Sequence, residues 1–303
     1  MGDVIVVENL RKSYGDVKAV QDISFTVKKG EIFGIIGPNG AGKTTTIEIL
    51  EGLRKRDDGN VSVLGFDPEK ERKNLNERIG VQFQATSIQR KMKVKEAIDL
   101  FSAFYENTEG KNEIIEMLGL ETKMNERFED LSGGWKQRVT LALATLHHPD
   151  IVFLDEPSMG LDPHARREMW GIIRSLRDKG CTIVVTTHYM EEAEKLCDRV
   201  AMIYSGQVKA LNRPQQLLDQ LAVSYLQFSC SEVNELQLSQ LPGVLRVEQE
   251  EEHYKLYSET LQSTSLALFQ LCEEKNYTIH DFSFAKGNLD DLFVHYLKEG
   301  ESA

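Results

Sequence analysis

Short runs of apolar residues alternate with amphipathic stretches through the first 220 residues of the chain. Several of these runs are apolar at every position, which is typical of central strands that are buried on both faces of a sheet. A sheet layered with helices is therefore predicted here, an α/β arrangement. The expected strands span residues 4–7, 31–36, 79–83, 151–154, 181–187 and 199–204. The expected helices span residues 43–53, 94–107, 134–147, 163–178 and 190–197.

The rhythm of apolar and polar positions changes after residue 220. The order strand, helix, strand, strand, helix, strand is expected there, which is that of a small α+β, ferredoxin-like domain. One further helix should begin after Asn288, with a stripe that favours packing in the domain's own core over a partner-binding face. Its apolar residues are Leu289, Leu292, Phe293, Tyr296 and Leu297. The expected elements are strands 222–230, 244–249, 253–258 and 277–284, and helices 232–240, 260–275 and 288–298.

The distribution of charge also places a domain boundary near residue 220. The chain has 303 residues, with 36 basic and 48 acidic side chains and a formal net charge of −12. Residues 1–220 hold 31 basic and 34 acidic residues, whereas residues 221–303 hold 5 and 14. Two domains, 1–220 and 221–303, are therefore expected. The acidic surplus argues against a general nucleic-acid binder, because phosphate backbones are held by basic surfaces.

The chain has no apolar stretch near the length of about twenty residues that a spanning helix needs, and its first residues lack the apolar core of a secretory signal. A cytoplasmic protein is expected. The cysteines lie far apart without a CxxC pair, so buried thiols are expected rather than a zinc site. They are Cys181, Cys197, Cys230 and Cys272.

Residues 37–44 read GPNGAGKT, which is the phosphate-loop pattern G-x-x-x-x-G-K-[ST] between an expected strand and an expected helix. Its glycines let backbone N–H groups surround a phosphate, and the helix N-terminus adds its positive end. Lys43 would supply a charge to the β and γ phosphates, and Thr44 a hydroxyl ligand for Mg²⁺. The spacing of the glycines disfavours a dinucleotide dehydrogenase. The expected nucleotide-binding residues are Gly37, Pro38, Asn39, Gly40, Ala41, Gly42, Lys43, Thr44 and Thr45.

Two acidic residues, Asp155 and Glu156, follow the apolar run at 151–154. A carboxylate at the end of a buried strand lies at the sheet edge where open α/β folds bind ligands, so Asp155 is a candidate Mg²⁺ ligand. Glu156 is a candidate general base that would orient and deprotonate a water attacking the γ-phosphate. Adjacent acids at a strand end are also common in solvated loops, and the phosphate loop favours the functional interpretation.

The segment LSGGWKQR at residues 131–138 resembles the signature of the ATP-binding subunits of ABC transporters, and the resemblance extends through most of residues 1–220. It implies a P-loop NTPase core with an N-terminal β subdomain and a helical subdomain at about residues 85–148. It also implies a head-to-tail dimer, in which the phosphate loop of one subunit and the LSGG element of the other hold the same ATP. Ser132, Gly133 and Gly134 would then bind the nucleotide.

Other elements of that family occur in the expected order. The resemblance implies that Tyr14 stacks on adenine and that Asp162, in SMGLD, belongs to the loop crossing the dimer interface. It further implies that Gln84 reaches the Mg²⁺ and the attacking water, as both a metal ligand and a catalytic residue. His188 corresponds to the histidine that contacts the γ-phosphate. Each of these residues alone has an ordinary structural explanation, so the assignments depend on the whole set.

One residue departs from the family pattern, because Trp135 stands where a glutamine is usual. An indole offers one N–H donor and no acceptor, so the amide's contact with the opposite ribose is not expected from it. Four cations, Arg90, Lys91, Lys93 and Lys95, follow the Gln84 region. They are interpreted as a solvated charged face, with proximity to a membrane subunit or lipid headgroups as the alternative.

The sequence is therefore interpreted as an ATP-hydrolysing subunit that docks on the inner face of the cell membrane and uses ATP with Mg²⁺. The resemblance is to export systems whose permease subunits are separate polypeptides, and the segment NLDDLF at 288–293 is similar to the end of the accessory domain in that branch. A second copy of the chain would complete a homodimer, or a related ATPase subunit would complete a heterodimer. Two alternatives are a soluble ABC ATPase acting on ribosomes or chromosomes and a ligand-sensing regulatory module. A GTPase is disfavoured, because no NKxD element is present.

Overall fold

The computed structural model of this protein describes residues 2–83, 88–105, 108, 110–221, 224–258 and 260–293. It divides into two compact units, Met1–Pro214 and Gln215–Ala303. Gln84 lies outside the described residues, and so do residues 294–298 of the helix predicted at 288–298. None of the described helices combines the length and the apolar character needed to cross a bilayer.

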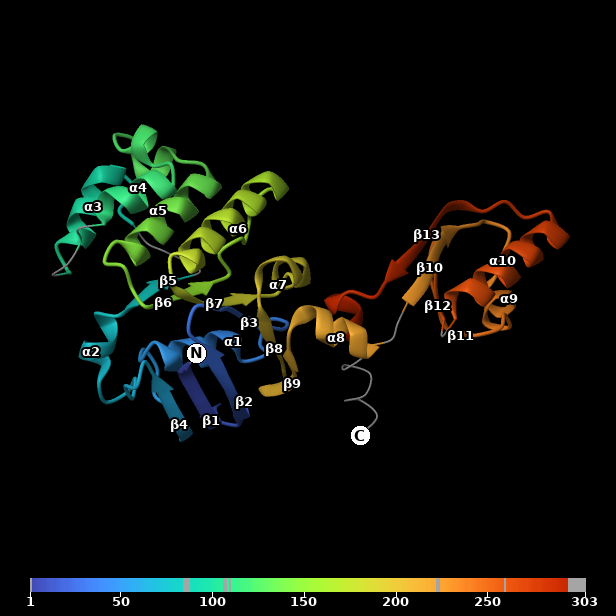
Figure 1. The fold of residues 1–303 in the computed structure, drawn as a ribbon, viewed down its shortest axis with the longest axis horizontal. Helices are drawn as coiled ribbons and strands as arrows, with labels where there is room; N and C mark the ends of the chain where they lie inside the picture. Colours follow the sequence, from blue (N-terminus) through green and yellow to red (C-terminus); the bar gives the residue numbers. More distant parts are fainter. Residues whose placement is uncertain are drawn as a thin grey trace. The chain divides into compact units, whose positions relative to one another are not determined.

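A six-stranded sheet lies at the centre of the first unit (Figure 1). Its strand order is β5-β6-β7-β3-β8-β9, and all neighbours are parallel except β8 and β9. The strands are β3 (Ile32–Ile36), β5 (Ile79–Gln82), β6 (Ile151–Asp155), β7 (Thr182–Thr187), β8 (Arg199–Tyr204) and β9 (Gln207–Asn212). Every residue of β3 and β7 is buried, which confirms that the runs at 31–36 and 181–187 form central strands.

A three-stranded antiparallel sheet with the order β2-β1-β4 forms a second layer. Its strands are β1 (Asp3–Tyr14), β2 (Val17–Lys28) and β4 (Asp58–Val63). Only the start of β1 was predicted from the apolar pattern. The pairing of β1 shifts between Val7 and Leu10, and Asn9 has a φ of 51°, so a bulge interrupts the alternation that reveals a strand. The stacking of Phe25 on Phe33, with ring centres 5.2 Å apart, joins the two sheets in one core.

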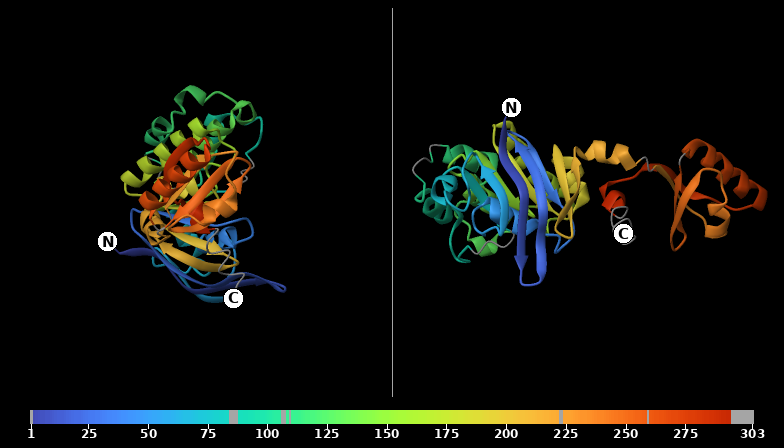
Figure 2. Two further views of the ribbon diagram at one scale, coloured as in Figure 1. Left: turned by 90° about the vertical axis from the view of Figure 1, so that its right-hand side faces the viewer. Right: turned by 90° about the horizontal axis from the view of Figure 1, so that it is seen from below.

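The helices of the first unit include those predicted, although several end a few residues early. They are α1 (Lys43–Leu50), α2 (Arg72–Asn76), α3 (Val94–Ser102), α4 (Lys111–Met117), α5 (Gly133–Thr145), α6 (Pro163–Asp178) and α7 (Met190–Leu196), with the 3-10 helices Glu121–Lys123 and Phe128–Asp130. The short α2 and α4 escaped prediction, because one or two turns show little periodicity. Figures 1 and 2 show α3 and α4 gathered beside α5, away from the three-stranded sheet.

The second unit contains the predicted order of elements. They are β10 (Ser224–Ser229), α9 (Glu235–Ser239), β11 (Val244–Glu250), β12 (His253–Ser258), α10 (Leu261–Lys275) and β13 (His280–Lys286), and α8 (Pro214–Leu221) precedes them at the boundary. The sheet has the order β11-β12-β10-β13 with every pair antiparallel, which is the ferredoxin-like arrangement. Leu226, Phe228 and Leu268 lie in its core.

Residues 289–293 are helical, as predicted. The N–H of Asp291 donates to Asn288 Oδ1 at 2.9 Å, so Asn288 caps this helix. Leu289 and Leu292 are buried, which agrees with the prediction that the apolar stripe of this helix packs in a core and does not form a partner-binding face. The four cysteines are free thiols, three of them buried and Cys181 half-buried.

Candidate functional site

The loop at residues 37–44 connects β3 to α1, and its glycines are required by the backbone. Gly42 has a φ of 103°, and a Cβ there would lie 2.3 Å from the carbonyl oxygen of Ala19. Gly37 has a φ of 150°, and its Cβ would lie 2.1 Å from the carbonyl oxygen of Ile203. Any larger residue would force the neighbouring strands apart. The loop therefore has the close backbone approach and the helix start that a phosphate site needs.

The side chain of Lys43 is buried in this loop. Its Nζ donates to the carbonyl oxygens of Gly37 at 2.8 Å and Pro38 at 3.0 Å. Burial lowers the pKa of Lys43, while the nearby carboxyls of Glu156 and Asp155 raise it. The ammonium group is thus held within the loop and close to the two acids. Its loop partners are uncharged carbonyls, which a phosphate oxygen can replace.

Thr44 and Asp155 offer oxygen atoms for a metal ion near this loop. Thr44 is exposed at the start of α1, whereas the hydroxyl of Thr46 already donates to the carbonyl oxygen of Gly42 at 2.9 Å. Asp155 ends β6, and its Oδ1 accepts a hydrogen bond from Thr186 Oγ1 on the adjacent β7. Burial raises the pKa of Asp155, and the bond from Thr186 opposes that change. The residue types fit Mg²⁺, which prefers oxygen ligands.

Glu156 and His188 lie together at the ends of the neighbouring strands β6 and β7. Glu156 is buried, and its backbone N–H donates to the carbonyl oxygen of Thr186 at 3.1 Å. Its φ is 50°, in the left-handed region that non-glycine residues seldom adopt. Oε1 of Glu156 lies 3.0 Å from Nδ1 of His188. Strained backbone at a buried acid is typical of functional positions, and the pair can carry a proton between a water and the imidazole.

The predicted residues of the signature segment and of the SMGLD segment line a cavity of about 350 Å³. Ser132, Gly133 and Gly134 lie at the beginning of α5, and Asp162 lies at the beginning of α6. Asp162 Oδ1 accepts hydrogen bonds from the N–H groups of His164 and Ala165, which lower the pKa of Asp162. The structure therefore places the signature segment, at residues 131–138, beside the SMGLD segment, at residues 158–162.

Trp135 lines the same cavity, and cations lie near its ring. The guanidinium carbon of Arg138 is 4.7 Å from the ring centre, and the Nζ of Lys123 is 5.3 Å from it. Arg138 also forms an ion pair with Glu168 of α6 at 2.9 Å. These contacts hold the indole in place, at the position where the family usually has glutamine.

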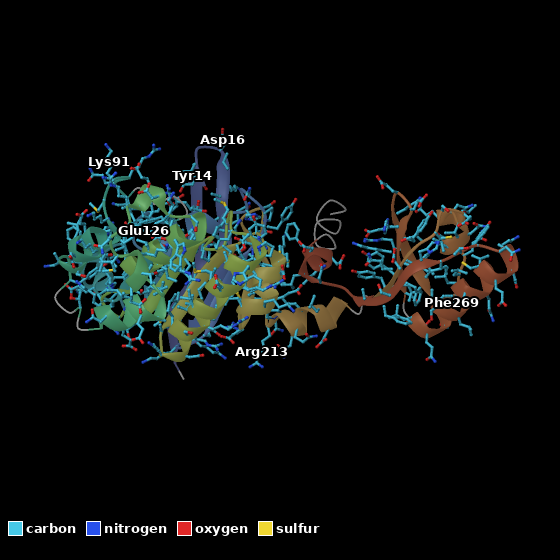
Figure 3. All side chains as sticks on the ribbon, turned by 90° about the horizontal axis from the view of Figure 1, so that it is seen from above. Tyr14, Asp16, Lys91, Glu126, Arg213 and Phe269 are labelled. Atoms are coloured by element: carbon cyan, nitrogen blue, oxygen red, sulfur yellow. The ribbon has the colours of Figure 1, made fainter. Side chains whose placement is uncertain are left out.

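Tyr14 lies at the end of the β1–β2 hairpin, beside the turn that carries Asp16 (Figure 3). Its side chain is 41% exposed. The cations of Lys12 and Arg54 lie 5.5 and 5.2 Å from the ring centre. The ring is thus accessible for stacking.

The four cations that follow the Gln84 region are expected to form a solvated face. Arg90, Lys91 and Lys95 are exposed, and Lys93 is half-buried. Figure 3 shows Lys91 at the surface of the helical region. This agrees with a solvated charged face.

One buried polar cluster is not evident from the sequence. Glu192 of α7 is fully buried, and its Oε1 accepts hydrogen bonds from Ser158 Oγ and from Trp170 Nε1, the latter at 2.9 Å. The cluster fixes the segment between Glu156 and Asp162 against α6 and α7. Its three members are far apart in the sequence, so no local pattern reveals them.

Comparisons with known proteins agree with this geometry. Residues 20–159 match the family described as ABC transporter. The chain is 40% identical to the Nod factor export ATP-binding protein I of Rhizobium etli over 70% of its own length and 69% of the relative. It is 35% identical to the linearmycin resistance ATP-binding protein LnrL of Bacillus subtilis, over 77% of this chain and 76% of the relative.

Solved structures give the same result. The chain resembles cbiO1 of Clostridium perfringens, part of the ABC transporter complex cbiONQ, with a TM-score of 0.67 and 26% identity over 73% of this chain and 92% of that one. It also resembles a bacterial ABC transporter cassette solved as a dimer, with a TM-score of 0.61 and 27% identity over 69% and 98%. A post-hydrolysis dimer of that cassette, bound to ADP and phosphate, matches equally well. This chain therefore belongs to the ABC transporter family, as one of its ATP-binding, ATP-hydrolysing subunits.

Proposed function

We propose that the chain powers export through separate membrane-spanning subunits, by closing a head-to-tail dimer on ATP at the inner face of the membrane. The names of the relatives support export, since one serves Nod factor export and another linearmycin resistance. The observation that carries the proposal is the contact of 3.0 Å between Glu156 and His188, close to Lys43. Ser132 and Asp162, which would form the signature half of a composite site, line one cavity of the same chain.

In the proposed mechanism, Lys43 releases the carbonyls of Gly37 and Pro38 and donates to oxygens of the β and γ phosphates. Glu156 accepts a proton from a water whose oxygen attacks the γ-phosphorus. The bond from that phosphorus to the bridging oxygen breaks, and ADP and phosphate leave. His188 holds a γ-phosphate oxygen and keeps Glu156 oriented through their shared hydrogen bond. Positioning and charge stabilisation supply most of the rate enhancement in phosphoryl transfer.

We propose that Thr44, Asp155 and Gln84 hold the Mg²⁺ that accompanies ATP. Magnesium supplies neutralisation of phosphate charge when it is bound. Within the described ranges, no group of three His, Cys, Asp or Glu residues forms a metal site. The carboxylate of Asp155, the hydroxyl of Thr44 and the amide oxygen of Gln84, together with the phosphates, would give Mg²⁺ the oxygen ligands that it prefers.

The domain assignment and the dimer belong to the same proposal. Residues 1–220 would form the ATP-binding domain with a helical subdomain at about 85–148, and residues 221–303 an accessory domain. The nucleotide would lie between Tyr14 and the phosphate loop of one subunit and the Ser132–Gly134 segment of the other. Each chain carries both halves, which supports a homodimer, and a heterodimer with a related subunit would use the same contacts.

The proposed docking surface for the membrane subunit is a cavity of about 550 Å³ between α2, β5, α3 and α5. We call it the docking groove. Three apolar residues in its wall are exposed, namely Leu53 at 41%, Phe83 at 47% and Phe104 at 71%. Exposed apolar residues gathered in a cavity usually mark a binding surface. A short amphipathic helix from the membrane subunit suits a groove of this kind.

Affinity purification from detergent-solubilised membranes of source cells tests this function. Tagged full-length chain should bring down a polypeptide with several spanning helices in fixed stoichiometry, and the complex should hydrolyse ATP. The matched control is the Phe83→Asp, Phe104→Asp double variant, which should lose the membrane polypeptide but keep its own ATP binding. Purification with ribosomes or chromosomal proteins, and without a membrane polypeptide, would contradict the proposal in favour of a soluble ABC ATPase.

A further inference from the structure

Thr186 places a hydroxyl group in a fully buried position of the central strand β7. The side chain is 0% exposed, and the strand is apolar at the three positions before it. Valine has nearly the same shape, favours strands equally and carries no polar atom. A buried hydroxyl loses its hydrogen bonds with water, so it needs partners within the protein. The identity of these partners indicates what the hydroxyl does.

Both partners of this hydroxyl lie at the end of the neighbouring strand β6. Oγ1 of Thr186 donates a hydrogen bond to Oδ1 of Asp155 and accepts one from the backbone N–H of Glu156 at 3.2 Å. Asp155 and Thr186 are direct partners in the parallel register of the two strands, so the pairing of the sheet brings these groups together. One hydroxyl thus contacts both acids of the proposed mechanism.

The contact with Asp155 fixes its carboxylate. Among the described residues, Thr186 is the hydrogen-bond donor to that carboxylate, at Oδ1, and none is found for Oδ2. Lys43 is near it but donates to the carbonyl oxygens of the phosphate loop instead. A hydrogen bond to one oxygen restricts the rotation of a carboxylate and leaves the other oxygen for a metal ion. Such outer partners orient metal-binding side chains in many proteins.

The contact with Glu156 holds its backbone. Its φ of 50° is unfavourable for a residue with a Cβ, so the surrounding structure must maintain this conformation. The N–H of Glu156 is shared between the hydroxyl of Thr186 and the carbonyl oxygen of the same residue, which lies at 3.1 Å. The side chain of Glu156 contacts Nδ1 of His188, two residues further along the chain. One segment, residues 186–188, therefore holds Glu156 by its backbone and by its carboxylate.

We propose that Thr186 is a positioning residue for ATP hydrolysis, whose hydroxyl fixes both the carboxylate of Asp155 and the backbone of Glu156. This inference rests on the proposed function, which makes Asp155 a ligand of Mg²⁺ and Glu156 the general base. Valine at this position would keep the strand and the carbonyl contact but remove the hydroxyl from both acids. The fold should therefore survive this change, while metal binding and catalysis should not.

Metal binding by the full-length chain tests the contact with Asp155. Mn²⁺ replaces Mg²⁺, and it is titrated into the protein with a non-hydrolysable ATP analogue while electron paramagnetic resonance detects the ternary complex. Thr186→Val should bind Mn²⁺ about tenfold to a hundredfold more weakly than the wild type, the usual effect of removing the partner of a metal ligand. Binding of the analogue without any divalent metal should not change, because the phosphate loop carries it.

ATP hydrolysis tests the contact with Glu156. At saturating Mg²⁺, kcat of Thr186→Val should remain at least about tenfold below that of the wild type, because the base is less well oriented. The KM for ATP should change by less than about twofold, since this contact does not touch the nucleotide. A purely structural loss would lower the fraction of folded protein and leave kcat per folded molecule unchanged.

Two further comparisons isolate the hydroxyl of Thr186. Thr182→Val is the matched control: Thr182 lies in the same strand, is 1% exposed and accepts the N–H of Gly30 at 3.0 Å, about 13 Å from Thr186 along the strand. It should keep the Mn²⁺ affinity and kcat of the wild type. Thr186→Ser should recover most of both properties, whereas Thr186→Ala should not. Serine and alanine differ by the hydroxyl alone, so this pair decides the question even if Thr186→Val does not fold.

The proposal is wrong if Thr186→Val matches the wild type in both measurements, if Thr182→Val loses as much, or if Thr186→Ala equals Thr186→Ser. Asp155→Asn separates such a result from a failure of the proposed function. Loss of Mn²⁺ binding in Asp155→Asn, with full binding in Thr186→Val, would remove Thr186 and leave the metal site intact. Full binding in both variants would show that Asp155 is not a metal ligand, and the inference would fall with that assignment.

Discussion

Nδ1 of His188 lies 3.0 Å from Oε1 of Glu156, although the residues are 32 positions apart. The parallel neighbours β6 and β7 bring them together, because Glu156 follows the first strand and His188 the second. The left-handed φ of Glu156 at 50° turns the chain at this point. The sheet order therefore builds the pair on which the proposed hydrolysis depends.

Replacement of His188 by alanine should lower kcat for ATP hydrolysis by about 10²–10⁴-fold, because Glu156, the residue that takes the proton, would lose the contact that orients it. The affinity for ATP should change little, because Lys43 and the loop carry most of the binding. Phosphate release and titration with a fluorescent ATP analogue separate the two effects. A kcat within a few-fold of the wild type would show that His188 is only structural.

Gly42→Ala should abolish nucleotide binding, because the added Cβ would lie 2.3 Å from the backbone of Ala19 and the loop would have to move. Gly30→Ala is the matched control. Gly30 also has a positive φ, 75°, but its Cβ would meet nothing within 4 Å. The control should therefore lose roughly 1–2 kcal/mol of stability through left-handed strain and still bind ATP. Equal binding by both variants, measured by calorimetry, would contradict the assigned role of the loop.

Trp170→Phe should reduce the free energy of unfolding by about 1–3 kcal/mol. The reason is that Glu192, which is fully buried, would lose the donor that lies 2.9 Å from its Oε1. Trp135→Phe keeps an aromatic ring beside Arg138 and Lys123 and should cost less than about 1 kcal/mol. Urea unfolding followed by circular dichroism gives both values. Equal losses in the two variants would mean that the indole N–H of Trp170 is unimportant.

The stability of the wild type should fall relative to Glu51→Gln as the pH rises from about 4.5 to about 8. The folded state holds the proton of Glu51 up to about pH 8, whereas the unfolded chain releases it near its ordinary value of 4.5. The unfolded state therefore binds fewer protons in this window, and unfolding becomes easier by up to about 1.4 kcal/mol per pH unit. Urea unfolding at several pH values measures the difference, and a constant difference would contradict it.

The sequence predicts the strands and the helix that surround the phosphate loop and the two acids, because motifs and buried strands are local. Asp155 and Glu156 lie at the end of β6, His188 follows β7, and the loop that carries Lys43 follows β3, so all four come after parallel strands that end at one sheet edge. The hairpin of β1 and β2 was harder to predict, since bulges interrupt its alternation. The order of the elements in the second unit is predicted correctly. Its last strand is expected from residue 277 but begins at His280, because Asn276 ends α10 with a φ of 55°.

The features that the sequence does not reveal are long-range. Ser158, Trp170 and Glu192 look ordinary until the fold buries them in one cluster. Glu51 resembles any acidic residue at a helix end, and only the structure places it in the wall of a cavity. Such side chains acquire their meaning from neighbours that are distant in the chain.

The most direct test of the account uses Glu156→Gln, which keeps the shape of the side chain but cannot accept the proton. With ATP this variant should not turn over, and light scattering should show a stable dimer of about twice the 34.4 kDa chain. Adding Lys43→Met to the same variant should return it to a monomer, because the phosphates lose their charge partner. Turnover at the wild-type rate by Glu156→Gln, or a monomer in saturating ATP, would contradict the general base and the ATP-closed dimer.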